Sequence, residues 1–60
     1  MAHQFEPGDR MLIRCVGGPS RSRLENYPPA LEVLEHDGIY VLVDDGPPDR
    51  WWYQFVPREP

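Results

Sequence analysis

Two runs of β-forming residues flank the dipeptide Asp37-Gly38, and this pattern constrains the fold more than any other stretch of the chain. The first run covers residues 30–35 and the second covers residues 39–44. Asp-Gly between two such runs favours a two-residue type I′ turn, because both central residues of that turn need a positive φ. The sequence therefore predicts a central β-hairpin with its turn at Asp37-Gly38.

Both faces of this predicted hairpin are apolar. With the turn at Asp37-Gly38, Leu34 opposes Val41 on one face. The other face carries Leu31, Val33, Glu35, Tyr40, Leu42 and Asp44. A sheet with one face in water alternates apolar and polar residues, whereas apolar residues on both faces indicate a closed or two-layered arrangement.

Two further strands are predicted on either side of the hairpin. Residues 10–16 alternate, with Met11, Ile13 and Cys15 on one face and Leu12 between two arginines on the other. Residues 51–56 form the last strand, in which Trp51, Tyr53 and Phe55 share the face predicted to fill the core. Trp52 points the other way, and residues 20–27 are predicted to be a polar loop.

These short strands predict an all-β fold, a small SH3-like barrel of four to five antiparallel strands. Residues 1–60 make a single domain, with residues 1–6 and 58–60 as flexible tails. A chain of this length buries only about 60% of the surface that its unfolded form exposes. Its stability must therefore come from a well-packed core or from association with another chain.

Composition excludes several classes of protein. One cysteine and two histidines without ligand spacing predict no disulfide, no metal site and no cofactor. A net charge of −4 argues against nonspecific nucleic-acid binding, which depends on neutralising phosphates. No apolar run approaches the ~20 residues of a membrane span, and no signal-peptide pattern opens the chain. We therefore expect a cytoplasmic protein that does not contact a membrane.

A family resemblance supports the same fold. Residues 8–13, Gly-Asp-Arg-Met-Leu-Ile, resemble the G-D-x-V-x-V opening of many SH3-like barrels, including KOW-type domains. Residues 31–35 and 40–46 are similar to the body of short actinobacterial proteins of unknown function with that barrel. The basic, glycine-bearing second turn with which KOW domains touch RNA is missing. The resemblance therefore implies a fold, and small barrels host many activities.

No arrangement of residues points to catalysis, and we expect no enzyme activity. Cys15 alternates in phase with Met11 and Ile13, which predicts a buried structural thiol. His36 lies beside the predicted turn without a partner of known catalytic spacing. The acidic residues 44, 45 and 49 lack the spacing of a calcium loop and are typical of a solvated turn.

The aromatic residues instead suggest a protein-binding surface. Trp52 is out of phase with the core aromatics, and we expect it to be partly exposed near Tyr40 or Tyr27. The alternative is that Trp52 covers the open end of the barrel within its own chain. Exposed Trp and Tyr are favoured at interfaces because they bury much area at little entropic cost. Arg21 and Arg23 in the polar loop could contact an acidic partner. The leading hypothesis is a non-enzymatic interaction domain that binds a protein partner or a second copy of itself, as a homodimer.

Two other functions stay open. A nucleic-acid-associated regulatory barrel would use Arg10, Arg14, Arg21 and Arg23, against the acidic second half of the chain. An oligomeric enzyme with a shared central pore is the third class. This hypothesis rests on Tyr53-Gln54-Phe55, which resembles a strand of the plasmid-borne dihydrofolate reductases.

Overall fold

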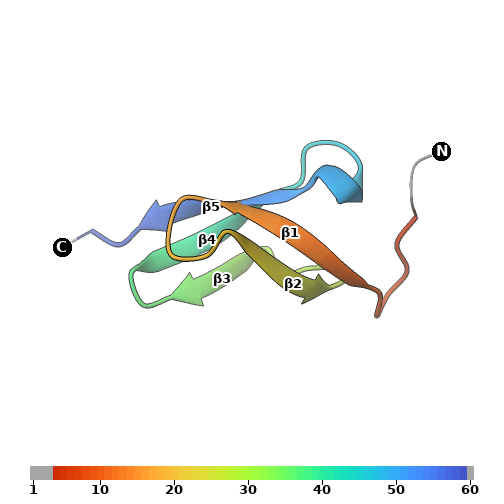
Figure 1. The fold of residues 1–60 in the computed structure, drawn as a ribbon, viewed down its shortest axis with the longest axis horizontal. Helices are drawn as coiled ribbons and strands as arrows, with labels where there is room; N and C mark the ends of the chain where they lie inside the picture. Colours follow the sequence, from red (N-terminus) through yellow and green to blue (C-terminus); the bar gives the residue numbers. More distant parts are fainter. Residues whose placement is uncertain (1–3, 60) are drawn as a thin grey trace.

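Five strands and one short 3₁₀ turn make up the part of the chain that the structure, a computed structural model, describes, residues 4–59 (Figure 1). In chain order they are β1 (Arg10–Val16), β2 (Ser22–Asn26), β3 (Glu32–Glu35), β4 (Gly38–Val43), η1 (Pro48–Arg50) and β5 (Trp52–Pro57). They form one sheet that curls into half a barrel. The predicted all-β, small barrel-like fold is confirmed.

The sheet is mixed rather than purely antiparallel. Its strand order is β2-β1-β5-β4-β3, and the β1–β5 pair is parallel, with Cys15 beside Tyr53. The other three pairs are antiparallel. Every connection between β1 and β5 reverses the chain, so β5 returns beside β1 in the same direction. The prediction of only antiparallel strands is wrong for this one pair.

Strand β2 lies where the sequence predicted a polar loop. It pairs antiparallel with β1, and Leu24 stands opposite Leu12. Arg23 and Glu25 occupy the inward positions of this strand, beside Ile13 and Met11 of β1. Because charged residues hold the positions that apolar residues hold in other strands, the alternation gives no hydrophobic signal.

The central hairpin exists, but its turn is one residue earlier than predicted. Glu35 pairs with Gly38, so His36 and Asp37 form the turn. Leu34 consequently faces Ile39 instead of Val41, a shift of two residues along β4. An even shift leaves every side chain on its predicted face. The expected type I′ turn is wrong, since no described residue other than glycine has a positive φ and Gly38 does not have one either.

Gly38 is needed for space rather than for a left-handed backbone. It is buried inside β4, where it pairs with Pro57 of β5. A Cβ atom at this position would lie 2.8 Å from Cζ of Phe55 and 2.9 Å from Cα of Pro57. Such close approach of two strands explains the glycine and places it in the strand instead of the turn.

The two edge strands, β2 and β3, are joined by side chains instead of a backbone ladder. Arg23 Nη1 donates to Glu35 Oε1 at 2.9 Å, and Arg23 Nε donates to Glu25 Oε1 at 3.1 Å. The hydrogen bond to Glu25 raises the pKa of Arg23. A guanidinium thus spans the seam at which a complete barrel would have two strands hydrogen-bonded.

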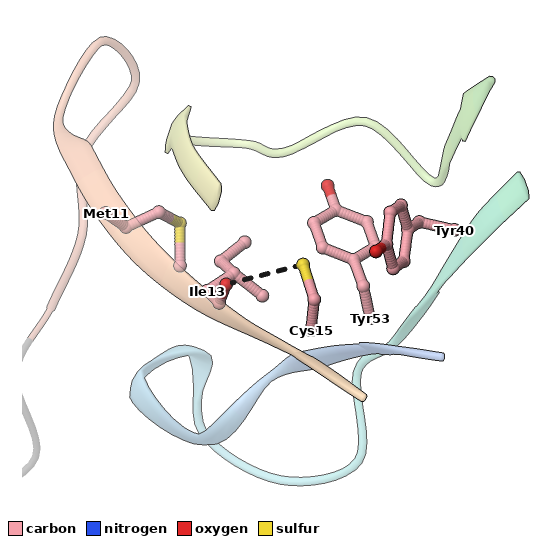
Figure 2. Packing of buried hydrophobic residues seen from close by; sticks show 5 residues of the cluster. All are labelled: Met11, Ile13, Cys15, Tyr40 and Tyr53. Atoms are coloured by element: carbon pink, nitrogen blue, oxygen red, sulfur yellow. Dashed lines mark hydrogen bonds between the residues drawn. The ribbon is translucent and has the colours of Figure 1, made fainter. Parts of the chain in front are cut away.

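The interior holds a small apolar core. Five buried side chains form one apolar cluster on the inside of the curled sheet: Met11, Ile13, Cys15, Tyr40 and Tyr53 (Figure 2). The buried thiol is confirmed, and burial raises the pKa of Cys15. Of the three aromatics predicted for the core, Tyr53 is fully buried, whereas Trp51 and Phe55 are partly buried and pack against the cluster.

Both buried tyrosines satisfy their hydroxyl groups on loop backbone. The Tyr40 hydroxyl accepts from Ser20 N at 2.9 Å and donates to Gly17 O at 3.1 Å. The Tyr53 hydroxyl donates to Ala30 O at 2.8 Å. Buried polar atoms need such partners, because an unsatisfied one costs about 1–3 kcal/mol. These bonds tie the loops on either side of β2 to the core.

Aromatic residues also stack at the periphery. Tyr27 lies between Phe5 and Trp51, with ring centroids 5.7 and 6.1 Å apart. At the other end of the chain, Arg58 N donates to Asp37 O at 2.7 Å. Contacts therefore extend into both segments expected to be tails, of which residues 1–3 and 60 lie outside the described part.

Candidate protein-binding surface

The outer face of the sheet is the candidate site, and strand alternation builds it. In β1 the inward positions are Met11, Ile13 and Cys15, so Leu12 and Arg14 point outward. In β5 the buried Tyr53 points inward, so Trp52 points outward. The register then brings outward residues of neighbouring strands side by side, as with Arg14 and Trp52.

Apolar side chains continue across this face over all five strands. On β2 and β1, Leu24 stands beside Leu12. In the middle of the sheet, Trp52 of β5 stands beside Val43 of β4. Further along β5, Val56 stands beside Ile39 of β4, which stands beside Leu34 on the edge strand β3. We call this set the outer apolar band; its members are Leu12, Val16, Leu24, Leu34, Ile39, Val41, Val43, Trp52 and Val56.

The two ends of the outer apolar band are open to solvent. Leu12 is 71% exposed and Leu34 is 81% exposed. Single exposed leucines are ordinary, but a contiguous apolar patch on a small protein marks a place of interaction. Leu24, Val16 and Val56 are also exposed. With Leu31, which lies outside the band, six large apolar side chains are exposed among the described residues, against five apolar side chains that are buried.

A groove deepens the band on one side. It lies between the outer side of β1 and η1, with a volume of about 320 Å³. Its lining residues are Leu12, Arg14, Val16, Asp49, Arg50, Trp51 and Trp52. The groove thus combines the apolar side chains of Leu12, Val16 and the two tryptophans with two guanidinium groups and one carboxylate, that of Asp49.

Charge on the outer face is divided between its two ends. Arg10 and Arg14 point outward from β1, whereas Glu32 points outward from β3. None of the three forms an ion pair within residues 4–59. The face therefore has a basic end at β1 and an acidic end at β3, on opposite sides of the band.

The structure disperses the five residues that the sequence predicted for binding. Trp52 is partly exposed and lines the groove, as expected. Tyr40 is 0% exposed, so its predicted place on the surface is wrong: it points inward from β4, in phase with Leu42. Tyr27 is partly exposed and lies in the ring stack, away from the outer face.

The two loop arginines also separate. Arg21 is exposed just before β2, and its carbonyl oxygen accepts a hydrogen bond from Cys15 N. Arg23 points inward and is held by two glutamates at the seam. The pair therefore does not form one basic patch, because the Arg23 guanidinium is engaged at the seam whereas Arg21 lies outside β2.

Sequence reasoning missed the leucines of the band. Leu12 was placed on the face with Arg10 and Arg14, which is where it lies, but its exposure gave no reason to single it out. Leu24 was hidden in the segment read as a loop. The signal that could have found Leu24 is its position opposite Leu12, which needs β2 to be recognised first.

The interior offers little for catalysis. The Cys15 thiol donates to Ile13 O at 3.9 Å, and its raised pKa favours the unreactive protonated form. Burial raises the pKa of Tyr53 to about 12, so its hydroxyl stays protonated at neutral pH. Among the described residues, no three His, Cys, Asp or Glu side chains gather as a metal site.

Comparison with known proteins returned no match, whether to family models, to curated proteins or to solved structures. In the described part of the chain, none of the helical segments has the length and apolar character needed to cross a membrane.

Proposed function

We propose that this chain is a non-enzymatic protein-interaction domain of the SH3-like barrel type, and that its outer apolar band binds another polypeptide. The observation that carries the proposal is that every strand from β2 (Leu24) to β3 (Leu34) carries apolar side chains on this face, with Arg14 and Gln54 among them. The face has no covering layer among the described residues. Burial of apolar area contributes about 25 cal/mol per Å², so such a face gains much by association.

Trp52 is the expected centre of binding. It lies midway along the band and forms a wall of the groove. Tryptophans in such positions carry a large share of the binding energy at interfaces. The guanidinium groups of Arg14 and Arg50 beside it would select partners that present a carboxylate next to an apolar side chain.

The other two function classes have less support. A nucleic-acid surface would gather arginines on one side, but Arg23 is engaged with Glu25 and Glu35. For the shared-pore enzyme, Gln54 lies on the outer face and its amide nitrogen donates to Phe55 O at 3.1 Å. We therefore keep protein binding as the proposal, in the cytoplasm as expected for a chain with one free thiol.

The test is substitution of Trp52 on immobilised protein. We expect the wild type to retain a protein ligand, and Trp52→Ala to weaken that binding by about 2 kcal/mol, roughly 30-fold. Arg21→Ala is the matched control, since Arg21 is exposed but away from the outer face. Equal binding by wild type and Trp52→Ala, with both folded by circular dichroism, would refute the proposal.

A further inference from the structure

We propose that the polypeptide bound by the outer apolar band is a second copy of this chain, related by a two-fold axis that lies between the two faces. This inference rests on the proposed function and names its partner. The outer face carries charges of opposite sign at its two ends, and it carries exposed leucines at both ends.

Charges of opposite sign lie at the two ends of the outer face. The β1 end of the face carries Arg10 and Arg14, and the β3 end carries Glu32. All three are exposed and none forms an ion pair with another described residue. Unpaired charges of opposite sign at the two ends make the face complementary to itself when one copy is turned end for end.

The apolar residues show the same two-ended pattern. Leu12 and Leu24 lie on β1 and β2 at the basic end, whereas Leu34 lies on β3 at the acidic end. Trp52 and Val43 lie between them. An axis that crosses the band near Trp52 would place the leucines of one copy on the Leu34 end of the other. It would also bring Arg14 to Glu32 of the second copy.

Two-fold symmetry makes this contact twice. In an isologous dimer, if residue i of one copy contacts residue j of the other, then residue j of the first copy contacts residue i of the second. Each dimer would therefore contain two Arg14–Glu32 contacts, one at each end of the interface. A turn about an axis that left the ends unexchanged would instead place arginine against arginine, which like charges disfavour.

The available area is sufficient. A stable interface buries about 800 Å² on each partner. The whole chain exposes 4729 Å², so the dimer would cover roughly one sixth of that surface. One face of a five-stranded sheet can supply this fraction. A chain of sixty residues with five buried core side chains also stands to gain stability from association.

The experiment is solution mass measured against concentration, for two charge reversals and their mixture. Wild type should pass from 7.0 kDa to twice that mass as concentration rises. Arg14→Glu alone, and Glu32→Arg alone, should each raise the dissociation constant at least tenfold, because each places like charges together at both ends. An equimolar mixture of the two variants should dimerise like wild type, since both contacts are then again between opposite charges.

Matched controls use exposed charges on residues outside the strands of the sheet. Arg21→Glu and Glu6→Arg make the same changes of net charge and should leave the mass curve unchanged. Leu34→Ser provides a variant without a charge change, and it should shift the curve toward monomer while the circular dichroism spectrum stays that of wild type. If the charge reversals leave the dissociation constant of the dimer unchanged, or if the equimolar mixture remains monomeric, the inference is overturned.

The result also separates the two proposals. A wild type that stays at 7.0 kDa at every concentration refutes the second copy as partner. If that monomer still binds a different protein, and Trp52→Ala abolishes the binding, the proposed function survives without the dimer. If the monomer binds nothing, both fail.

Discussion

The inner and outer faces of this sheet have similar apolar content and opposite surroundings. On β5, Tyr53 is completely buried while its neighbour Trp52 remains partly exposed. The inner face is finished by polar tips: two tyrosine hydroxyls bonded to loop backbone, and a guanidinium held by two carboxylates. The outer face has no such bonds at its apolar members. The two faces therefore differ less in hydrophobicity than in whether the polar tips of their side chains have hydrogen-bond partners.

The largest difference between the two faces is expected when Tyr53 and Trp52, neighbours on β5, are each truncated to alanine. Tyr53→Ala should lower the free energy of unfolding by about 3–5 kcal/mol, as for other buried aromatics, because it opens a cavity and frees Ala30 O. Trp52→Ala should cost much less, since its side chain already meets water. Chemical denaturation of both variants measures this. Equal losses would show that the outer face supports the fold as much as the interior does.

Alkaline pH should weaken the inner face specifically. The pKa of Tyr53 is raised from 10.0 to about 12 in the folded chain, mainly by burial. A raised pKa stabilises the folded state below the unfolded value and loses that contribution as pH rises through the folded one. We expect roughly 2–3 kcal/mol to be lost between about pH 10 and pH 12.

Tyr53→Phe is the control for this titration, because it keeps the ring and removes the ionising hydroxyl. Its free energy of unfolding should fall less steeply over the same range. Cys15 adds to the trend from lower pH, since burial raises its pKa above 9.0. Identical pH profiles for wild type and Tyr53→Phe would show that this hydroxyl does not govern alkaline stability.

The smallest effect is expected at the seam between β2 and β3. Arg23 and Glu35 are partly exposed, so their ion pair should contribute at most about 1 kcal/mol. A double-mutant cycle with Arg23→Ala and Glu35→Ala isolates that coupling from the effect of Glu25. A coupling of several kcal/mol would mean that the seam behaves as interior.

Much of the fold follows from alternation alone. The limits of β1 and the faces of β1, β4 and β5 could be predicted, because a strand whose inner positions are apolar shows its phase directly. Strand β2 could not, since Arg23 and Glu25 fill its inner positions and find their partner only on β3. Local sequence contains no record of that long-range pairing.

The candidate surface was predictable in part for the same reason. Trp52 was found because it is out of phase with Tyr53, and its partial exposure agrees. Tyr40 was misplaced although alternation correctly grouped it with Leu42. Alternation tells which residues share a face of the sheet, but it does not tell which of the two faces is buried. Gly38 was misread as a turn residue, since the tight approach of Phe55 that requires it appears only in three dimensions.

The parallel pairing of β1 with β5 determines how this domain would sit in a fusion protein. Arg14 is level with Trp52, so β1 begins four residues before this level and β5 ends five residues after it. At about 3.3 Å per residue these nine steps separate the two strand ends by roughly 30 Å. Polypeptide that precedes β1 and polypeptide that follows β5 would thus leave the sheet from its opposite ends.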